Sequence, residues 1–337
     1  MAGWDPLYSH AGSTEGLVHA PMMFAFGQTA LFETPQVLTI GNFDGVHRGH
    51  QAVIAQARAA ADARGMPLTV LLFEPQPREV FARLRGDPPP VRLMTLRDKV
   101  EALADLHVDC VWCLRFDRIR QMTAEHFVAS LIAGQRVSHL VVGDDFRFGA
   151  DRRGDFIYLT EAGARFGFTL EQSATHCDGP ARISSSRIRD ALTAHDFDLA
   201  AQLLGRPFAL SGRVIYGRQL GRTLGFPTAN IRLPKNTPLA GVFGCEIRLP
   251  DGAMARGIAN IGTRPTVSGG GSWLEVHLHH QNLELYGQRL TVIPRFFIRP
   301  EQKFESVELL SAQIAKDNRI ALDQLTALLG PELHDRL

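Results

Sequence analysis

Between residues 37 and 170, short apolar runs alternate with segments of helical character, and this alternation limits the possible fold more than any other feature. Short, unbroken apolar runs are typical of strands that are buried on both faces of a parallel sheet. The helical segments between them supply the crossovers that parallel strands require. The sequence therefore predicts an α/β domain with a parallel, Rossmann-like sheet, whose strands lie at about residues 37–40, 68–73, 108–114, 140–143 and 168–170.

The segments between these runs have the periodicity and end signals of helices. Residues 51–61 are rich in helix formers, and apolar residues recur at helical spacing over 96–106. Thr123 is suited to cap a helix, and another helix is predicted over about residues 157–166. In such a domain ligands bind beyond the carboxyl ends of the strands, so the loops at that edge are candidate sites.

The loop after the first apolar run spans residues 41–50 and reads Gly-Asn-Phe-Asp-Gly-Val-His-Arg-Gly-His. Its glycines let the backbone turn sharply and approach a ligand closely. The helix behind it offers unpaired N–H groups and a positive dipole end to a phosphate, next to His47 and His50. A glycine-rich turn with two surface histidines is the alternative, which the length of the motif disfavours. The two histidines alone predict no metal, because a zinc site needs further ligands.

Three further strings belong to the same predicted site. Phe-Glu-Pro-Gln-Pro at 73–77 follows the second run and forms either a ligand wall or a proline-stiffened loop. Gly-Asp-Asp-Phe-Arg-Phe-Gly at 143–149 follows the fourth run, where a site loop is favoured over a turn with an exposed ion pair. Arg-Ile-Ser-Ser-Ser-Arg-Ile-Arg at 182–189 combines helix-capping hydroxyls, exposed N–H donors and a guanidinium, which together suit a phosphate.

The pattern changes after a short helix predicted over residues 196–205. Alternating, turn-punctuated segments without crossover helices predict antiparallel strands that close into a β-barrel. A long terminal helix is predicted over about residues 304–329, with Val307, Leu310, Ile314, Ala321, Leu325 and Leu328 facing the core. The candidate strands are 208–216, 229–233, 242–249, 253–260, 273–280 and 289–298.

The barrel carries a second glycine-rich loop, although the chain contains no P-loop sequence. Residues 217–230 read Gly-Arg-Gln-Leu-Gly-Arg-Thr-Leu-Gly-Phe-Pro-Thr-Ala-Asn, in which three glycines four residues apart make a pliable loop that can wrap phosphates. Thr228 and Asn230 offer hard oxygen ligands of the kind that Mg²⁺ accepts. Glu275 alternates with Leu274 and Val276 and so faces away from the core, where a solvated strand glutamate is the alternative to a catalytic one.

In this order, from about residue 36 to about 320, the strings resemble those of the bacterial bifunctional riboflavin kinase/FAD synthetase family. The family patterns are GNFDGVHxGH, GDDFRFG, ISSTxIR, GRxLGFPTAN and LEVH. This chain departs from the family at Gln76, often histidine, at Ser186, usually threonine, and at Pro300, commonly acidic. The resemblance implies that the barrel phosphorylates riboflavin to FMN with ATP and Mg²⁺. It also implies that the N-terminal nucleotidyltransferase domain transfers AMP from a second ATP to FMN, giving FAD and pyrophosphate.

The resemblance also assigns roles to individual residues. It implies that Glu275 is the base of the kinase and that His47 and His50 are catalytic in adenylyl transfer. Thr228 and Asn230 are the implied Mg²⁺ ligands. Implied flavin contacts are Phe73, Pro75 and Arg299, although a surface ion pair is as good an interpretation of Arg299. The implied nucleotide- and phosphate-binding residues are Gly41, Asn42, Phe43, Asp44, Gly49, Asp145, Ser184, Ser185, Arg187, Gly217, Arg218, Gly221 and Gly225. There are two alternatives to an enzyme with both activities. One domain has lost its activity, or the protein is a regulator that binds flavin or nucleotide without turnover.

Length and composition agree with a two-domain enzyme that acts on small molecules. For the 337 residues we predict a partly disordered arm over 1–35, the FMN adenylyltransferase domain over 36–203 and the riboflavin kinase domain over 204–337. A net charge of +1 gives no sign of nucleic-acid or membrane-surface binding, and it does not indicate an oligomeric state.

Cysteine usage and hydropathy predict a cytoplasmic protein. Cys110 and Cys113 spell a CxxC motif inside an apolar run, which predicts two buried strand thiols and not a redox pair. No apolar run reaches the roughly 18 residues of a membrane-spanning helix, and residues 1–20 lack a signal-peptide pattern.

Overall fold

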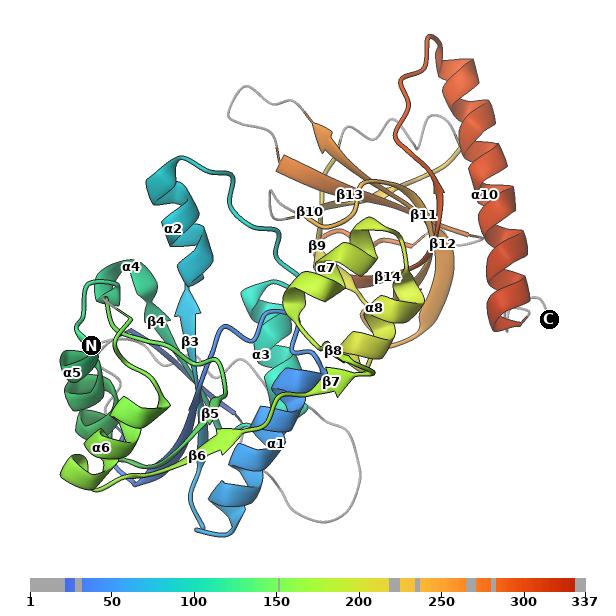
Figure 1. Cartoon of the computed structure of the whole chain (residues 1–337). Helices are drawn as coiled ribbons and strands as arrows, with labels where there is room; N and C mark the ends of the chain where they lie inside the picture. Colours follow the sequence, from blue (N-terminus) through green and yellow to red (C-terminus); the bar gives the residue numbers. More distant parts are fainter. Residues whose placement is uncertain are drawn as a thin grey trace. The chain divides into compact units, whose positions relative to one another are not determined.

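The computed structural model describes residues 22–27, 32–150, 152–217, 225–233, 237–264, 271–279 and 283–330. The chain forms two compact units. Unit 1 comprises Met1–Pro90 and Leu96–Ile183, and unit 2 comprises Val91–Thr95 and Ser184–Leu337. Each unit is built around one sheet (Figure 1).

Unit 1 contains the predicted parallel sheet. Its strands pair in the order β1-β4-β3-β2-β5-β6, and every neighbouring pair is parallel. The central strands are almost entirely buried, as expected for a sheet covered on both faces. The strands are β1 (Met23–Phe26), β2 (Gln36–Ile40), β3 (Leu68–Glu74), β4 (Cys110–Arg115), β5 (Val137–Gly143) and β6 (Thr169–Ser173).

The edge strand β1 lies within residues 1–35, for which the sequence predicted only a partly disordered arm. Met23–Phe26 pairs with β4 in parallel, and the indole of Trp112 donates to the Gly27 carbonyl at 2.9 Å. The strand was missed because it is only four residues long and leaves Phe24 and Phe26 exposed, so it lacks the apolar run of a buried strand. The described part of the sheet therefore has six strands where five were predicted.

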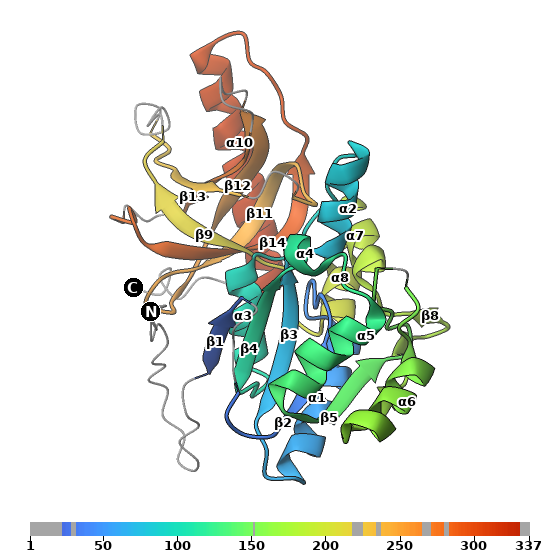
Figure 2. The same cartoon turned by 90° about the vertical axis from the view of Figure 1, so that its left-hand side faces the viewer.

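Helices cover both faces of this sheet (Figure 2). α1 (Arg48–Asp62) packs against β2 and β5, and α3 (Leu96–Ala104) precedes β4. A separate core packs Leu38, Trp112 and Leu140 of the sheet against the segment from α5 to α6. The remaining elements are α2 (Pro77–Arg85), α4 (Phe116–Ile119), α5 (Ala124–Phe127), the π-helix η1 (Val128–Ile132), the 3₁₀-helix η2 (Ala133–Gln135), α6 (Phe156–Phe166), β7 (Cys177–Asp178) and β8 (Ala181–Arg182).

The predicted thiols and helix cap are confirmed. Cys110 and Cys113 are buried in β4, and burial raises the pKa of the Cys110 thiol to about 12, which makes it a poor nucleophile at neutral pH. Thr123 caps α5 by accepting a hydrogen bond from the backbone N–H of His126 at 3.2 Å.

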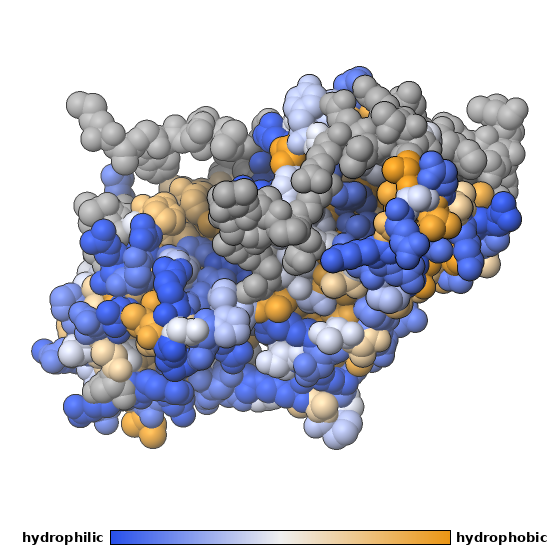
Figure 3. Space-filling view, turned by 90° about the horizontal axis from the view of Figure 1, so that it is seen from above, coloured by the Kyte–Doolittle hydropathy of each residue, from blue (hydrophilic) through white to orange (hydrophobic). Residues whose placement is uncertain are grey.

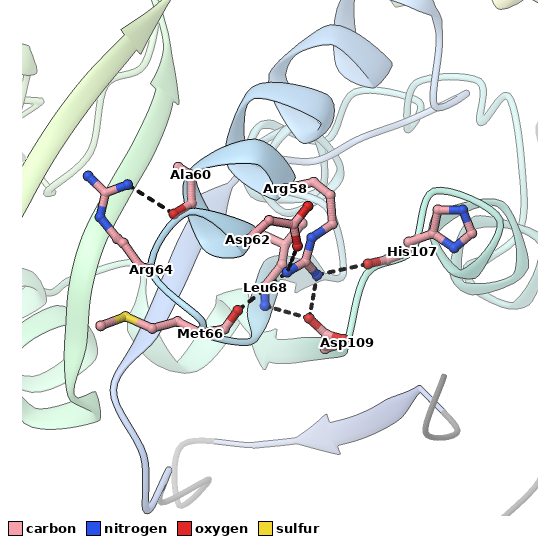
Figure 4. Close-up of polar contacts among 8 residues, drawn as sticks. All are labelled: Arg58, Ala60, Asp62, Arg64, Met66, Leu68, His107 and Asp109. Carbon is pink, nitrogen blue, oxygen red and sulfur yellow. Dashed lines mark hydrogen bonds and ion pairs between the residues drawn. The ribbon is translucent and has the colours of Figure 1, made fainter. Parts of the chain in front are cut away.

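A polar network ties the end of α1 to the starts of β3 and β4 (Figure 4). The guanidinium of Arg58 pairs with Asp62 at 2.8 Å and with Asp109 at 2.5 Å, and it donates to the carbonyls of Met66 and His107. Asp109 also accepts the backbone N–H of Leu68 at 2.7 Å. The network lies at the amino end of these strands, opposite the edge where the loops of the predicted site begin.

We expect Arg58→Met to lower the free energy of unfolding of unit 1 by about 1–2 kcal/mol, because hydrogen bonds to charged groups are lost from a partly exposed cluster. Urea unfolding followed by circular dichroism measures the change. Arg85→Met is the control, since Arg85 forms an exposed pair with Asp87 and should cost less than about 0.5 kcal/mol. Equal effects of the two substitutions would contradict the stabilising role of the network.

Unit 2 contains the predicted closed antiparallel barrel, with the strand order β10-β13-β12-β11-β14-β9. The antiparallel pairing of β10 with β9 closes it. Two helices precede the barrel, α7 (Ser185–Thr193) and α8 (Phe197–Leu204), and the ring of His195 between them stacks on Phe297 at 4.0 Å. The strands are β9 (Leu210–Ile215), β10 (Ala229–Arg232), β11 (Gly241–Arg248), β12 (Met254–Arg264), β13 (Gly271–Leu278) and β14 (Arg289–Arg299).

The predicted terminal helix is α10 (Val307–Leu329), which runs along the outside of the barrel (Figure 1). Ala321 and Leu325 are buried against Ile258 of β12, as predicted. The assignment of Val307 and Leu328 to the core is wrong, since both are more than half exposed. They lie near the ends of the helix, where α10 has less of the barrel to pack against.

No helix in the described part of the chain is long and apolar enough to cross a membrane. Among the coloured residues of Figure 3, hydrophilic side chains predominate and hydrophobic ones form small, scattered groups.

Candidate active sites

The loop between β2 and α1 has an unusual backbone. Phe43 and Val46 have positive φ angles of 45° and 41°, and Gly45 between them has 87°. A β-branched residue rarely adopts such a conformation, so Val46 stores local strain. Burial of Phe43 and Val46 holds the loop in place. The side-chain amide of Gln51, on α1, donates to the Val46 carbonyl at 2.9 Å. Strained backbone of this kind is concentrated at functional sites.

The structure brings His47 and His50 together at the start of α1. His47 is the N-cap residue, and its Nδ1 accepts a hydrogen bond from the backbone N–H of His50 at 3.3 Å. The two rings stack with centroids 3.6 Å apart, and Phe43 meets His50 edge-on at 5.1 Å. A Cβ on Gly49 would lie 3.3 Å from the His47 ring, so glycine leaves room for the stack.

The imidazole of His50 is held neutral. Burial lowers its pKa well below 6.5, and electrostatic interaction with His47, Lys99 and Arg182 lowers the pKa further. Within the described residues, Nδ1 of His50 is buried and has no hydrogen-bond partner. The side-chain oxygen of Asn42 is likewise buried and unpartnered in the same described region. Such groups at a helix N-terminus suit a polar ligand such as a phosphate.

The other predicted residues of unit 1 lie at the same edge of the sheet. Asp145 follows β5 and pairs with Arg182 at 3.0 Å, and Arg182 also pairs with Asp144 at 3.1 Å. Asp145 thus shows the exposed ion pair that was the alternative interpretation, and nucleotide binding by this residue stays a prediction. The Phe73 ring is buried and meets Phe116 edge-on at 5.8 Å, while Pro75 follows the end of β3.

Ser184, Ser185 and Arg187 lie at the start of α7 in unit 2. Ser184 is the N-cap and accepts a hydrogen bond from the backbone N–H of Arg187 at 3.3 Å, so the predicted capped helix start is present. The predicted meeting of these residues with His47 and His50 spans the two units and stays a prediction.

A row of polar side chains crosses three strands of the barrel. Glu275 on β13 is directly opposite Asn230 on β10 and Asn260 on β12. Directly opposite residues of antiparallel strands project from the same face, so the three side chains are neighbours. The barrel interior is on the other face, where Leu274 and Val276 are fully buried. Asn260 also donates to Glu301 at 3.4 Å. The row was not predicted, because strand register cannot be read from the sequence.

The residues around this row orient the Thr228–Asn230 segment. The amide of Asn230 donates to the Thr228 carbonyl at 3.3 Å. Nδ1 of His277, two residues after Glu275, donates to the Pro227 carbonyl at 2.9 Å, and its ring packs edge-on against Phe226. The alternation of β13 places His277 on the same face as Glu275, so the strand that carries the predicted base also anchors the predicted metal ligands.

Gly217 is packed under the Asn230 side chain. A Cβ at this position would lie 2.5 Å from the amide nitrogen of Asn230, closer than real Cβ contacts allow. Gly225 is exposed with φ of 80°. Arg218 and Gly221 lie outside the described residues, so their predicted roles are not addressed by the structure.

We expect Gly217→Ala to lower the kcat of the barrel site about tenfold or more, because the added methyl group displaces Asn230. The reaction of unit 1 should stay within twofold, which makes it the internal control for folding. A steady-state assay of both reactions on one preparation measures this. An unchanged barrel reaction would show that Asn230 is not needed in its observed position.

Arg299 is engaged by the protein itself. Its guanidinium forms hydrogen bonds of 2.8 Å with Asp317 of α10, and it lies over the Phe304 ring at 5.6 Å. The ion pair that the sequence left open is therefore present, although it is buried and not at the surface, since Asp317 is 1% exposed. Flavin binding by Arg299 stays a prediction.

Comparison with known proteins decides the family. A family model described as FAD synthetase matches residues 30–187, and one described as riboflavin kinase matches residues 204–325. The chain is 48% identical over 297 residues to the bifunctional riboflavin kinase/FMN adenylyltransferase of Escherichia coli K12, covering 86% of this chain and 94% of that protein. The bifunctional riboflavin kinase/FMN adenylyltransferase of Pseudomonas fluorescens is also 48% identical, over 88% of this chain and 94% of that protein. This chain belongs to the bifunctional riboflavin kinase/FMN adenylyltransferase family.

As a member of this family, the chain is a transferase. Each of the two family models matches the segment that carries one of the two sets of motifs. The loop between β2 and α1, which carries His47 and is called the histidine loop below, lies within the FAD synthetase match. The row of Asn230, Glu275 and Asn260 lies within the riboflavin kinase match. The fold is similar to the crystal structure of a macrolide-efflux protein from Streptococcus pneumoniae, with a TM-score of 0.73 at 26% identity over 91% of this chain and 99% of that one.

Proposed function

We propose that this enzyme makes FAD in two steps, with the barrel of unit 2 phosphorylating riboflavin and the histidine loop of unit 1 transferring AMP to the FMN that results. The observation that supports this most is the presence of two separate polar constellations, His47–His50 at a helix start and Asn230–Glu275 on the barrel face. ATP is the second substrate of both steps, and pyrophosphate leaves in the second.

In the kinase step Glu275 accepts the proton of the riboflavin 5′-hydroxyl as its oxygen attacks the γ-phosphorus of ATP. The bond from that phosphorus to the bridging oxygen breaks, and ADP leaves. A positioned base of this kind contributes about 10²–10⁴-fold to the rate. Glu275 is half-buried, which limits competition from water.

Mg²⁺ fits the donor set beside this base. The Thr228 hydroxyl and the Asn230 amide oxygen are hard donors two residues apart, and Glu275 lies directly opposite Asn230. When bound there with ATP, the ion would neutralise charge on the phosphates. Asn230 is buried and packed against Gly217, so it holds its orientation before the substrate arrives.

In the adenylyl-transfer step FMN brings its own nucleophile, a phosphate oxygen that is ionised at neutral pH, so no general base is required. Attack at the α-phosphorus of ATP breaks the bond to the pyrophosphate. His47 and His50 donate to the phosphoryl oxygens, where charge grows in the transition state, and a neutral His50 can do so through its N–H. The N–H groups at the start of α1 add to this stabilisation.

We propose an FMN adenylyltransferase domain over residues 36–203 and a riboflavin kinase domain over 204–337. The two separate family matches, over 30–187 and 204–325, support a division into two functional segments. We place the enzyme in the cytoplasm, where ATP and flavins are available, with small molecules and no nucleic acid or membrane as partners.

A fragment that starts at Ser184 tests the division of labour. It keeps α7, α8 and the barrel, whose contacts include His195 with Phe297, and it lacks His47 and His50. We expect it to convert riboflavin to FMN within about threefold of the intact enzyme and to make no FAD. Product analysis by liquid chromatography measures both flavins. FAD production by the folded fragment would refute the assignment of adenylyl transfer to unit 1.

A further inference from the structure

Lys99 is fully buried, which is unusual for a lysine. It lies on α3 with 0% of its side chain exposed. A buried ammonium group is costly unless hydrogen bonds and opposite charge compensate it. Its Nζ donates to the backbone carbonyl of Asn42 at 2.7 Å and lies 3.9 Å from a carboxylate oxygen of Glu74.

These two partners belong to neighbouring loops of the adenylyl-transfer site. Asn42 is in the loop between β2 and α1, and Glu74 is the last residue of β3, directly before Pro75. β2 and β3 are adjacent in the sheet. Lys99 therefore links the strained histidine loop, between β2 and α1, to the loop that follows β3 at the same edge of the sheet.

The ammonium group also contributes charge to the site. His50 faces His47 on its own helix, the Phe43 ring from the loop, Lys99 from α3 and Arg182 from β8. Asp144 and Asp145 offset the charge of Arg182 at 3.1 and 3.0 Å, whereas Glu74 lies 3.9 Å from Nζ of Lys99 and compensates the ammonium group less directly. Positive charge at a site that takes a triphosphate favours its binding and stabilises charge that develops during transfer.

We propose that Lys99 is a positioning residue for adenylyl transfer, which fixes the loop between β2 and α1 through the Asn42 carbonyl and contributes positive charge next to it. The proposal rests on the proposed function of unit 1. A solely structural lysine would instead support folding without affecting the reacting groups.

Lys99→Met removes the charge and the hydrogen bond while nearly keeping the length of the side chain. We expect the kcat for FMN adenylylation to fall about 100-fold, because small displacements of a reacting geometry have effects of that size. Riboflavin phosphorylation, measured on the same sample, should stay within twofold. The NMR titration of the His50 ring should move to higher pH, because a neighbouring positive charge that lowers the His50 pKa is gone.

Arg97→Met is the matched control, because it removes a positive charge from the exposed face of the same helix, where Arg97 pairs with Glu101. It should leave both rates and the His50 titration unchanged. A Lys99→Met enzyme that only melts at lower temperature, with wild-type adenylylation kcat and wild-type His50 titration, would overturn the proposal. Failure of the wild-type enzyme to make FAD from FMN would instead refute the proposed function.

If Lys99→Met does not fold, two further variants, Lys99→Arg and Lys99→Gln, test whether the charge of Lys99 supports adenylylation. Arginine keeps a positive charge and donors, whereas glutamine keeps only a neutral donor. We expect Lys99→Arg to retain at least a tenth of the wild-type adenylylation kcat and Lys99→Gln to lose at least tenfold more. Equal kcat values in the two variants, at equal melting temperature, would contradict a role for the charge.

Discussion

FMN-to-FAD conversion by His50→Ala should fall by about 10²–10³-fold in kcat, the usual effect of removing one preorganised donor from a developing charge. The affinity for ATP should stay within about tenfold of the wild-type value, because the rest of the histidine loop and the N–H groups at the start of α1 remain. Riboflavin phosphorylation should be unchanged, so FMN should accumulate. Single-turnover formation of FAD, with ATP affinity measured separately, tests these expectations.

Two results would count against the catalytic role of His50. Near wild-type FAD formation would make the stacked pair His47–His50 a structural feature of the α1 start. Loss of both reactions, with a melted circular dichroism spectrum, would assign His50 to folding. His126→Ala is the control, since His126 is exposed on α5, away from the loop, and should change neither rate.

Glu275→Gln should lower the kcat for riboflavin phosphorylation by about 10²-fold or more, because the amide keeps the shape of the side chain and cannot accept the proton. FMN adenylylation should stay near normal. The barrel should remain folded, since Leu274 and Val276 on the core face are untouched. Steady-state assays with riboflavin or FMN as the starting flavin separate the two effects.

Glu305→Gln is the control for the loss of a carboxylate, because Glu305 is exposed before α10. It should leave the kinase rate within twofold. A normal kinase rate in Glu275→Gln would return Glu275 to the alternative of a solvated strand residue, and the row with Asn230 and Asn260 would then have a structural purpose.

Much of the fold could be predicted because hydrophobic periodicity and the turn and cap residues between elements are local features of the sequence. The buried runs that became β2, β3, β4 and β5 contrast with the alternating strands of the barrel, and the change near residue 205 coincides with the end of α8 at Gly205. Exposed edge elements are less predictable. β1 is short and half exposed, and its pairing with β4 depends on a contact some 90 residues away, which no local pattern encodes.

The sites divide in the same way. His47, His50 and Glu275 could be singled out from the sequence because each occurs in a dense string of unusual composition, and their catalytic roles stay predictions. Lys99 could not be, since on α3 it looks like an ordinary helix residue and only the fold brings it to Asn42. The ion pair of Arg299 with Asp317 likewise joins residues that are remote in the sequence and meet only when α10 packs on the barrel.

Product analysis over time, with riboflavin, ATP and Mg²⁺ as the only additions, tests the central claim most directly. The account predicts that FMN appears first and then declines as FAD and pyrophosphate accumulate in equal amounts. Riboflavin that stays unchanged would contradict the claim of an active enzyme and favour a binding protein, and FMN that accumulates without FAD would restrict the activity to the barrel.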